Sequence, residues 1–168
     1  MKVHTLVVGP LETNCYIITH NKECIIIDPG DEFNRIKEFV NNYNVVGCLL
    51  THAHDDHTGA LEEVLKTYNI TLNKIDNKSF KYTEISTPGH TSDSKCFYFE
   101  NINSIFCGDF LFKNSFGRID LGGNKKDMLN SFELISKYAD NIILYPGHGP
   151  KTTLGNEKKN FAIYKEYV

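Results

Sequence analysis

Residues 52–57 concentrate side chains that can bind metal ions. An apolar run ends at Leu50, and three histidines and two aspartates follow within six residues. Four of them fit the pattern H-x-H-x-D-H: His52, His54, Asp56 and His57. In extended backbone, residues two apart point the same way, so His52 and His54 can bind one ion together. Asp56 and His57 follow a turn and can face a second ion. Imidazole and carboxylate suit zinc, and also iron or manganese, whereas chance histidines in a polar loop would rarely be spaced this way.

Three more potential ligands each follow a predicted strand and a glycine: His90 and His148 in Pro-Gly-His, and Asp109 in Gly-Asp. Glycine permits close backbone approach and a positive φ at such positions. Five of the seven histidines thus lie at or just beyond a predicted strand end. Ligands at several strand ends are what one edge of a sheet sandwich provides. His4 and His20 are interpreted as polar strand and turn residues.

Hydrophobic patterning predicts the elements that position these ligands. We expect strands over 2–8, 15–18, 24–27, 45–50, 80–85, 96–99, 104–107 and 141–144. We expect helices over 33–43, 61–68, 128–138 and 156–167, and a loop over 113–126. Asp31 is the expected N-cap of the first helix, and Gly59 is expected to allow a tight turn after the histidines. The order predicts an α/β (α+β) chain with two similar halves, each a sheet with helices on one face.

Length and composition limit the class of protein. The 168 residues fit one domain spanning 1–168. A net charge of −3, from 18 basic and 21 acidic side chains, gives no electrostatic case for nucleic acid or an anionic membrane. We find neither a membrane-spanning apolar run nor a signal peptide. The five cysteines form no C-x-x-C pair and adjoin apolar residues, which favours buried reduced thiols and a cytoplasmic protein.

Together these motifs resemble the metallo-β-lactamase fold, and within it the glyoxalase II-like (hydroxyacylglutathione hydrolase-like) hydrolases. The resemblance covers nearly the whole chain. Its segments are THAHDDHTG from residue 51, TPGHT from 87, CGDFLF from 107, SFGRIDL from 115 and PGHGPKTTLGNE from 146. It implies an αββα sandwich of two mixed β-sheets flanked by helices, with the site at one edge of the sheets.

The resemblance also implies a dinuclear metal centre. It assigns the first ion to His52, His54 and His90. It assigns the second ion to Asp56, His57 and His148, with Asp109 bridging the two. All seven positions hold the expected residue type. The implied cofactors are two divalent ions, zinc first, with iron or manganese as alternatives.

The chemistry that such a centre supports is hydrolysis. Two neighbouring cations can share a water and lower its pKa toward about 7. The metal-bound hydroxide would attack the carbonyl of a small thioester or ester, such as an S-lactoylglutathione-type substrate. Asp56 and Asp109 are the expected catalytic residues, because they orient the ions and the nucleophile. Arg118 stands where relatives place a basic substrate-contacting residue and could hold a carboxylate; a surface pair with Asp120 is the alternative.

Two departures from the family pattern bear on the substrate. Glyoxalase II carries a C-terminal helical extension that helps to bind glutathione, whereas this chain ends about 20 residues after His148. We therefore expect poor discrimination for glutathione itself. Only 32 residues separate His57 from His90, which is short for the family and suggests an open or differently shaped cleft.

Two other functions fit the same ligands. Persulfide dioxygenases resemble this fold and use one iron, so a mononuclear iron oxidoreductase is one alternative. A non-catalytic metal-binding protein is the other. The intact ligand set favours the hydrolase over a non-catalytic role.

Overall fold

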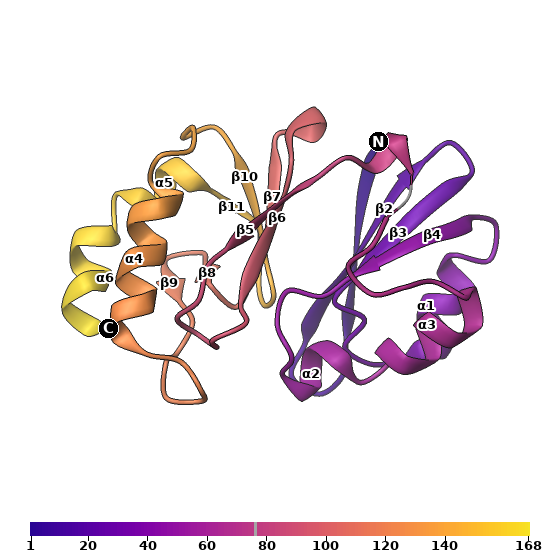
Figure 1. Cartoon of the computed structure of the whole chain (residues 1–168), viewed down its shortest axis with the longest axis horizontal. Coiled ribbons are helices and arrows are strands. Elements are labelled where there is room, and N and C mark those ends of the chain that lie inside the picture. The colour runs from indigo at the N-terminus through magenta and orange to yellow at the C-terminus, as the bar shows by residue number, and fades with distance from the viewer. Residues whose placement is uncertain (76) are drawn as a thin grey trace. The chain divides into compact units, whose positions relative to one another are not determined.

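The strands form two main sheets, one in each half of the chain (Figure 1). The computed structural model describes residues 1–75 and 77–168, which divide into two units, Met1–Lys81 and Tyr82–Val168. The first unit holds a four-stranded sheet of order β1-β2-β3-β4, and the second a five-stranded sheet of order β11-β10-β7-β6-β5. The two halves expected from the sequence are therefore present.

The first unit is built on antiparallel pairing of β1 with β2 and β2 with β3, followed by parallel pairing of β3 with β4. Helices α1 and α3 pack on one face of this sheet, where Ile36 and Val64 meet Ile17, Ile26 and Cys48. Its elements are β1 (Lys2–Val8), β2 (Thr13–His20), β3 (Glu23–Ile27), α1 (Phe33–Phe39), β4 (Asn44–Leu49), α2 (Asp55–Thr58), α3 (Leu61–Tyr68) and the 3-10 helix η1 (Lys78–Phe80).

One local prediction in the first unit is wrong. The N-cap of α1 is Glu32, with φ 53°, and not Asp31. The Asp31 carboxylate instead accepts a hydrogen bond from the backbone N–H of Glu32 at 2.6 Å, outside the helix. Asp31 therefore stabilises the turn that precedes α1, because a short carboxylate side chain readily binds the neighbouring backbone N–H.

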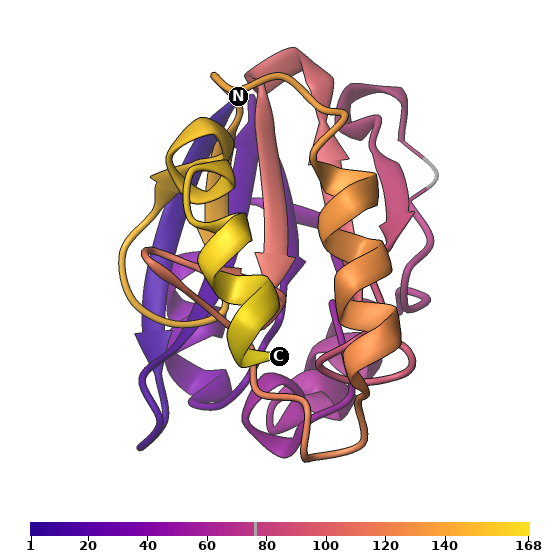
Figure 2. The same ribbon diagram turned by 90° about the vertical axis from the view of Figure 1, so that its left-hand side faces the viewer.

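The second unit has a mixed sheet in which β7 and β10 run parallel and the other neighbours antiparallel. Helices α4 and α6, orange and yellow, cover one face of it (Figures 1 and 2). Phe132 and Phe161 from these helices stack at 5.0 Å and pack against Ile105 and Leu144 from the strands. The elements are β5 (Thr83–Ser86), β6 (Lys95–Phe99), the 3-10 helix η2 (Glu100–Ile102), β7 (Ser104–Gly108), β8 (Leu111–Phe112), β9 (Ser115–Phe116), α4 (Lys125–Ile135), β10 (Ile143–Pro146), β11 (Thr152–Thr153), α5 (Leu154–Lys158) and α6 (Phe161–Tyr167).

Two predictions in the second unit need correction. The expected helix over 156–167 is two helices, α5 and α6, because Asn160 begins a new helix and its side chain donates to the Tyr164 hydroxyl at 3.3 Å. The expected loop over 113–126 contains β9, which forms a hairpin with β8. Asn114 makes its turn with φ 61°, a conformation that asparagine tolerates. Among the described residues, no helix is long and apolar enough to cross a membrane.

Candidate metal centre

The first two histidines of the motif lie on an extended segment between β4 and α2. The Nε2 atom of His52 and the Nδ1 atom of His54 are 3.1 Å apart, and the two ring centroids are 4.7 Å apart. The structure therefore brings together the pair that the H-x-H spacing predicts. Two nitrogens this close can bind one ion.

The second half of the motif lies in the short helix α2. His57 is fully buried, and its Nε2 atom is 3.6 Å from Oδ2 of Asp56. The Thr13 hydroxyl, on β2, donates to the same Asp56 oxygen at 2.7 Å and fixes the carboxylate. The ring centroid of His57 lies 4.2 Å from that of His52, so all four motif side chains gather in one place within the first unit.

A buried carboxylate that the sequence analysis did not single out supports this loop. Asp28 follows β3 and is 1% exposed. It accepts hydrogen bonds from the backbone N–H and the hydroxyl of Thr51, at 2.8 and 2.7 Å, and from Nδ1 of His57 at 3.0 Å. The signal in the sequence is a charged residue directly after four buried apolar residues, at the start of Asp-Pro-Gly.

Two glycines allow this loop to lie against the segment after β3. A Cβ atom on Gly30 would lie 1.9 Å from the backbone oxygen of Asp56, and one on Gly59 would lie 2.3 Å from the backbone oxygen of Gly30. Gly59 lies in the turn that ends α2, as expected, but its backbone angles, φ −55° and ψ −33°, are ones that any residue can adopt. Glycine is needed there for close backbone approach.

In the second unit, strand pairing places two of the predicted ligands side by side. Strands β7 and β10 are parallel, and the backbone N–H of Gly147 donates to the backbone oxygen of Gly108 at 2.8 Å. Asp109 and His148 therefore follow adjacent strand ends, and Oδ2 of Asp109 is 3.5 Å from Nε2 of His148. The same oxygen is 3.7 Å from Nε2 of His90. One carboxylate oxygen thus faces both histidines.

Backbone geometry fixes His90 in this position. Its Nδ1 atom lies 2.6 Å from the backbone oxygen of Arg118, which can only accept, so Nδ1 donates and Nε2 is the ring nitrogen that is available to a cation. A Cβ atom on Gly117 would lie 1.7 Å from the backbone oxygen of Asp109. Gly89 and Gly108, before His90 and Asp109, have φ 147° and 49°, as expected, whereas Gly147, before His148, does not have a positive φ.

The Arg118 side chain makes the surface pair that was one of its two interpretations. Its Nε and Nη2 atoms donate to the two carboxylate oxygens of Asp120, at 2.6 and 2.5 Å. These hydrogen bonds hold the pKa of Asp120 well below its usual range, at about 2. Both side chains are 62% exposed, so the guanidinium remains accessible to solvent.

The five cysteines are free and buried, as predicted. Burial raises the pKa of Cys24 to about 12, and it raises the pKa of Cys15, Cys48 and Cys107 as well. A thiolate nucleophile needs a lowered pKa and access to substrate. None of these four thiols meets that requirement.

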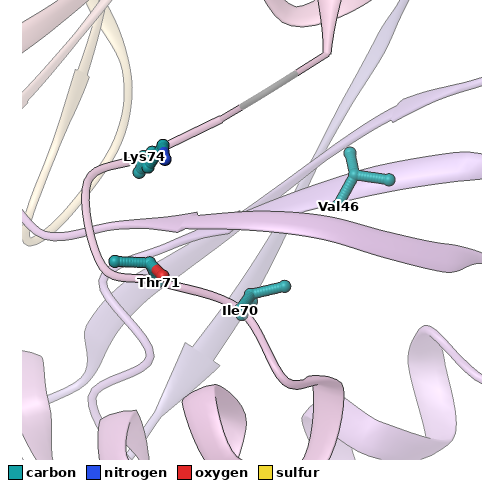
Figure 3. Close-up of a pocket in the computed structure, with 4 residues that line it drawn as sticks. All are labelled: Val46, Ile70, Thr71 and Lys74. Atoms are coloured by element: carbon teal, nitrogen blue, oxygen red, sulfur yellow. The ribbon is translucent and has the colours of Figure 1, made fainter.

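A small surface hollow lies elsewhere in the first unit (Figure 3). It has a volume of about 200 Å³ and is lined by Val46, Ile70, Thr71 and Lys74. Ligand pockets usually enclose about 300–1,000 Å³ and several convergent polar groups. This hollow is lined by one cationic side chain, Lys74, and by none of the predicted ligands.

The donor set of each unit fits a divalent cation. All seven side chains offer nitrogen or oxygen atoms, and Nδ1 of both His57 and His90 is bound by a protein oxygen. Histidines that bind zinc usually donate a hydrogen bond from their other ring nitrogen in this way.

Residues 8–83 and 73–148 match the family model described as the metallo-beta-lactamase superfamily. The chain belongs to this superfamily.

Relatives within the superfamily are named as hydrolases. One is the "Probable metallo-hydrolase YqgX" of Bacillus subtilis (strain 168), 28% identical over 94% of this chain and 95% of the relative. Another is a hydroxyacylglutathione hydrolase of Buchnera aphidicola subsp. Schizaphis graminum (strain Sg), 36% identical over 85% of this chain. That alignment spans 62% of the length of the hydroxyacylglutathione hydrolase.

Solved structures confirm the fold. The BLEG-1 B3 metallo-beta-lactamase superposes with a TM-score of 0.89 at 28% identity, covering 97% of this chain and 99% of that chain. A protein solved in a di-iron-bound form superposes with a TM-score of 0.83 at 25% identity, covering 98% and 100%. The predicted metallo-β-lactamase fold, with two mixed sheets flanked by helices, is confirmed.

Proposed function

We propose that this superfamily member is a metal-dependent hydrolase that cleaves a small thioester or ester at a dinuclear centre. The observation that carries the proposal is the convergence of Asp109 Oδ2 on the Nε2 atoms of His90 and His148. A carboxylate between histidines assigned to different ions is what a bridging ligand requires. The four clustered ligands of the first unit and the hydrolase relatives support it further.

Seven side chains would hold the two ions. The first ion would be bound by His52, His54 and His90. The second would be bound by Asp56, His57 and His148, with Asp109 shared. When bound, two such cations acidify a shared water and polarise the substrate carbonyl. Asp56, whose Oδ2 is held by the Thr13 hydroxyl, would orient the attacking water with its carboxylate.

We propose zinc as the metal, because imidazole and carboxylate ligands suit it. The same ligands also suit iron and manganese, and a structural relative has been solved with two irons. Elemental analysis of protein purified without chelator distinguishes these ions. Two equivalents of metal per chain are the expected result.

The substrate proposal is tested with a panel of acyl thioesters and esters that includes S-lactoylglutathione. We expect release of free thiol from small acyl thioesters, with little preference for the glutathione group. The chain aligns with 62% of the hydroxyacylglutathione hydrolase, so glutathione recognition is tested separately from hydrolysis. A kcat/KM much higher for S-lactoylglutathione than for simpler thioesters would contradict this expectation.

The same preparation tests the two alternatives. Oxygen consumption with a glutathione persulfide, at one iron per chain, would favour the persulfide dioxygenase-like oxidoreductase. A fully metal-loaded protein that turns over neither class of substrate would favour a non-catalytic metal-binding role. Either outcome would overturn the hydrolase proposal.

We also propose a cytoplasmic location and a small-molecule partner. Five free buried cysteines support the location, because reduced thiols persist in that compartment. A net charge of −3 supports a small-molecule substrate over nucleic acid or an anionic membrane.

A further inference from the structure

Asp28 combines an unusual backbone conformation with a buried, fully engaged carboxylate. Its φ is 52°, and its side chain is 1% exposed. Oδ1 accepts from the backbone N–H of Thr51, while Oδ2 accepts from the Thr51 hydroxyl and from Nδ1 of His57. A buried charge is costly unless such donors satisfy it. The arrangement thus needs a reason beyond packing.

The contact with His57 fixes which ring nitrogen carries the proton. A carboxylate can only accept hydrogen bonds, so Nδ1 of His57, 3.0 Å away, must be the donor. In the neutral ring, the lone pair then lies on Nε2. Nε2 is the atom that lies 3.6 Å from the carboxylate of Asp56 and would bind the second ion.

The contact with Thr51 extends the same constraint to a second histidine. The Thr51 hydroxyl has one proton, which it donates to Oδ2 of Asp28 at 2.7 Å. Toward Nδ1 of His52, 3.1 Å away, the hydroxyl oxygen must therefore accept. Nδ1 of His52 carries the proton, and its Nε2 carries the lone pair.

We propose that Asp28 is a positioning residue that sets the ring tautomers of ligands to both ions, acting on His57 directly and on His52 through Thr51. This rests on the proposed function, in which His52 binds the first ion and His57 the second. One carboxylate thereby prepares both halves of the dinuclear centre. Thr51 is the branch that serves the first ion alone.

The substitution Asp28→Asn should reverse both tautomers. The backbone N–H of Thr51 requires an acceptor at the Oδ1 position, so the amide NH2 must occupy the Oδ2 position. That NH2 would donate to Nδ1 of His57 and to the Thr51 hydroxyl, which would then donate to Nδ1 of His52. Both rings would carry the proton on Nε2. Asparagine tolerates a positive φ, so the backbone at this position stays unstrained.

The experiment is ¹⁵N NMR of the histidine ring nitrogens in the metal-free protein at about pH 8.5, where neutral rings dominate. The wild type should show Nδ1–H tautomers for His52 and His57. Asp28→Asn should convert both rings to the Nε2–H tautomer. Thr51→Val should remove the constraint on the tautomer of His52 and leave the tautomer of His57 unchanged. Thr51→Ser, which keeps the hydroxyl, should show the wild-type tautomers.

A matched control is Glu157→Gln, which changes another buried carboxylate with three hydrogen-bond donors, in the second unit. It should leave both tautomers unchanged. Competition titration with a chelator then measures metal affinity. Asp28→Asn should lower the affinity for both ions by about 10–100-fold, which is the usual effect of losing a hydrogen-bond partner of a metal ligand. Thr51→Val should lower the affinity for one ion only.

Unchanged tautomers in Asp28→Asn, or Nε2–H tautomers in the wild type, would overturn the inference. The tautomer readout uses metal-free protein, and the affinity readout measures metal binding without substrate, so both are independent of whether the enzyme is a hydrolase. An equal loss of affinity for both ions in Thr51→Val would contradict the arrangement in which Thr51 acts on His52 alone. Loss of the proposed thioesterase activity alone, with the tautomers as expected, would refute only the proposed function.

Discussion

At the scale of single residues, Asp109 has the largest expected effect on chemistry. Its Oδ2 atom faces Nε2 of both His90 and His148. A neutral amide cannot replace the charge that a bridging carboxylate brings to two cations. Losing a mere partner of a metal ligand costs about 10–100-fold, so Asp109→Asn should lower kcat/KM by more than about 100-fold. Steady-state kinetics with the best thioester measures this.

The same substitution should leave the fold intact. We expect the melting temperature of metal-free Asp109→Asn to lie within about 4 °C of the wild type, which corresponds to about 1 kcal/mol for a chain of this size. Asp120→Asn is a surface control that should retain activity on neutral substrates. Parallel losses of activity and thermal stability in Asp109→Asn would make Asp109 a structural residue.

Arg118 can be tested separately from its backbone. The hydrogen bond to His90 uses the backbone oxygen of Arg118, which every substitution retains. If the guanidinium binds substrate, Arg118→Ala should weaken the binding of carboxylate-bearing substrates by about 1.5–3 kcal/mol and leave the binding of neutral esters nearly unchanged. Kinetics on a matched pair of charged and neutral thioesters measures the difference.

Asp120→Asn provides the matched control for Arg118. It removes the carboxylate that pairs with the guanidinium, at 2.5 and 2.6 Å, and should therefore not weaken charged substrates. If Arg118→Ala and Asp120→Asn reduce activity on both substrates equally, the pair stiffens the loop and does not bind substrate.

At the scale of elements, the segment after β3 lies in close contact with helix α2, which carries two of the proposed ligands. Gly30→Ala would put a Cβ atom 1.9 Å from the backbone oxygen of Asp56, so the backbone of α2 must move. Overpacking of this kind costs about 1–3 kcal/mol. We expect that loss in urea denaturation, together with binding of fewer than two metal ions per chain.

Gly155→Ala is the control for this prediction. Its Cβ atom would lie 2.8 Å from the Cβ atom of Asp140, so it also creates a clash, but one against a residue of the second unit that is not a predicted ligand. It should lower stability and retain both ions. Full metal content in Gly30→Ala would show that α2 can shift without disturbing Asp56 and His57.

The same scale explains what the sequence could predict. Strand β1 follows from the alternation of polar and apolar residues and β7 from a short apolar run, and the candidate ligands follow from their positions at predicted strand ends. Asp28 and Glu157 escape such reasoning because their partners are distant: Thr51 lies 23 residues from Asp28, and Asn114 lies 43 residues from Glu157. The hairpin of β8 and β9 was missed because each strand has two residues, too few for a periodic pattern.

At the scale of the whole molecule, each unit has its own apolar core, and neither core includes a predicted metal ligand. The first core includes Ile17, Ile26 and Val64, and the second includes Phe132 and Leu144. We therefore expect a chelator to abolish turnover and leave secondary structure largely intact. Circular dichroism and activity, measured on the same sample, test both halves of the prediction.

Metal added back provides the control for chelation. Activity should return with the ion that elemental analysis identifies in the purified protein. Loss of the far-ultraviolet dichroism signal on chelation would show that the ions hold the fold together. Persistent turnover after complete metal removal would contradict the metal-dependent chemistry.

The buried cysteines allow local unfolding of each unit to be measured by thiol labelling. Cys15, Cys24 and Cys48 mark the first unit, and Cys96 and Cys107 mark the second. An alkylating reagent attacks thiolates that are exposed, so each buried thiol can react only after the structure around it unfolds. If residues 1–168 behave as one domain, mass spectrometry should find both sets of cysteines labelled at one rate. Two different rates would show that the two units unfold independently of each other. The native cysteines suffice for this measurement, without an engineered probe.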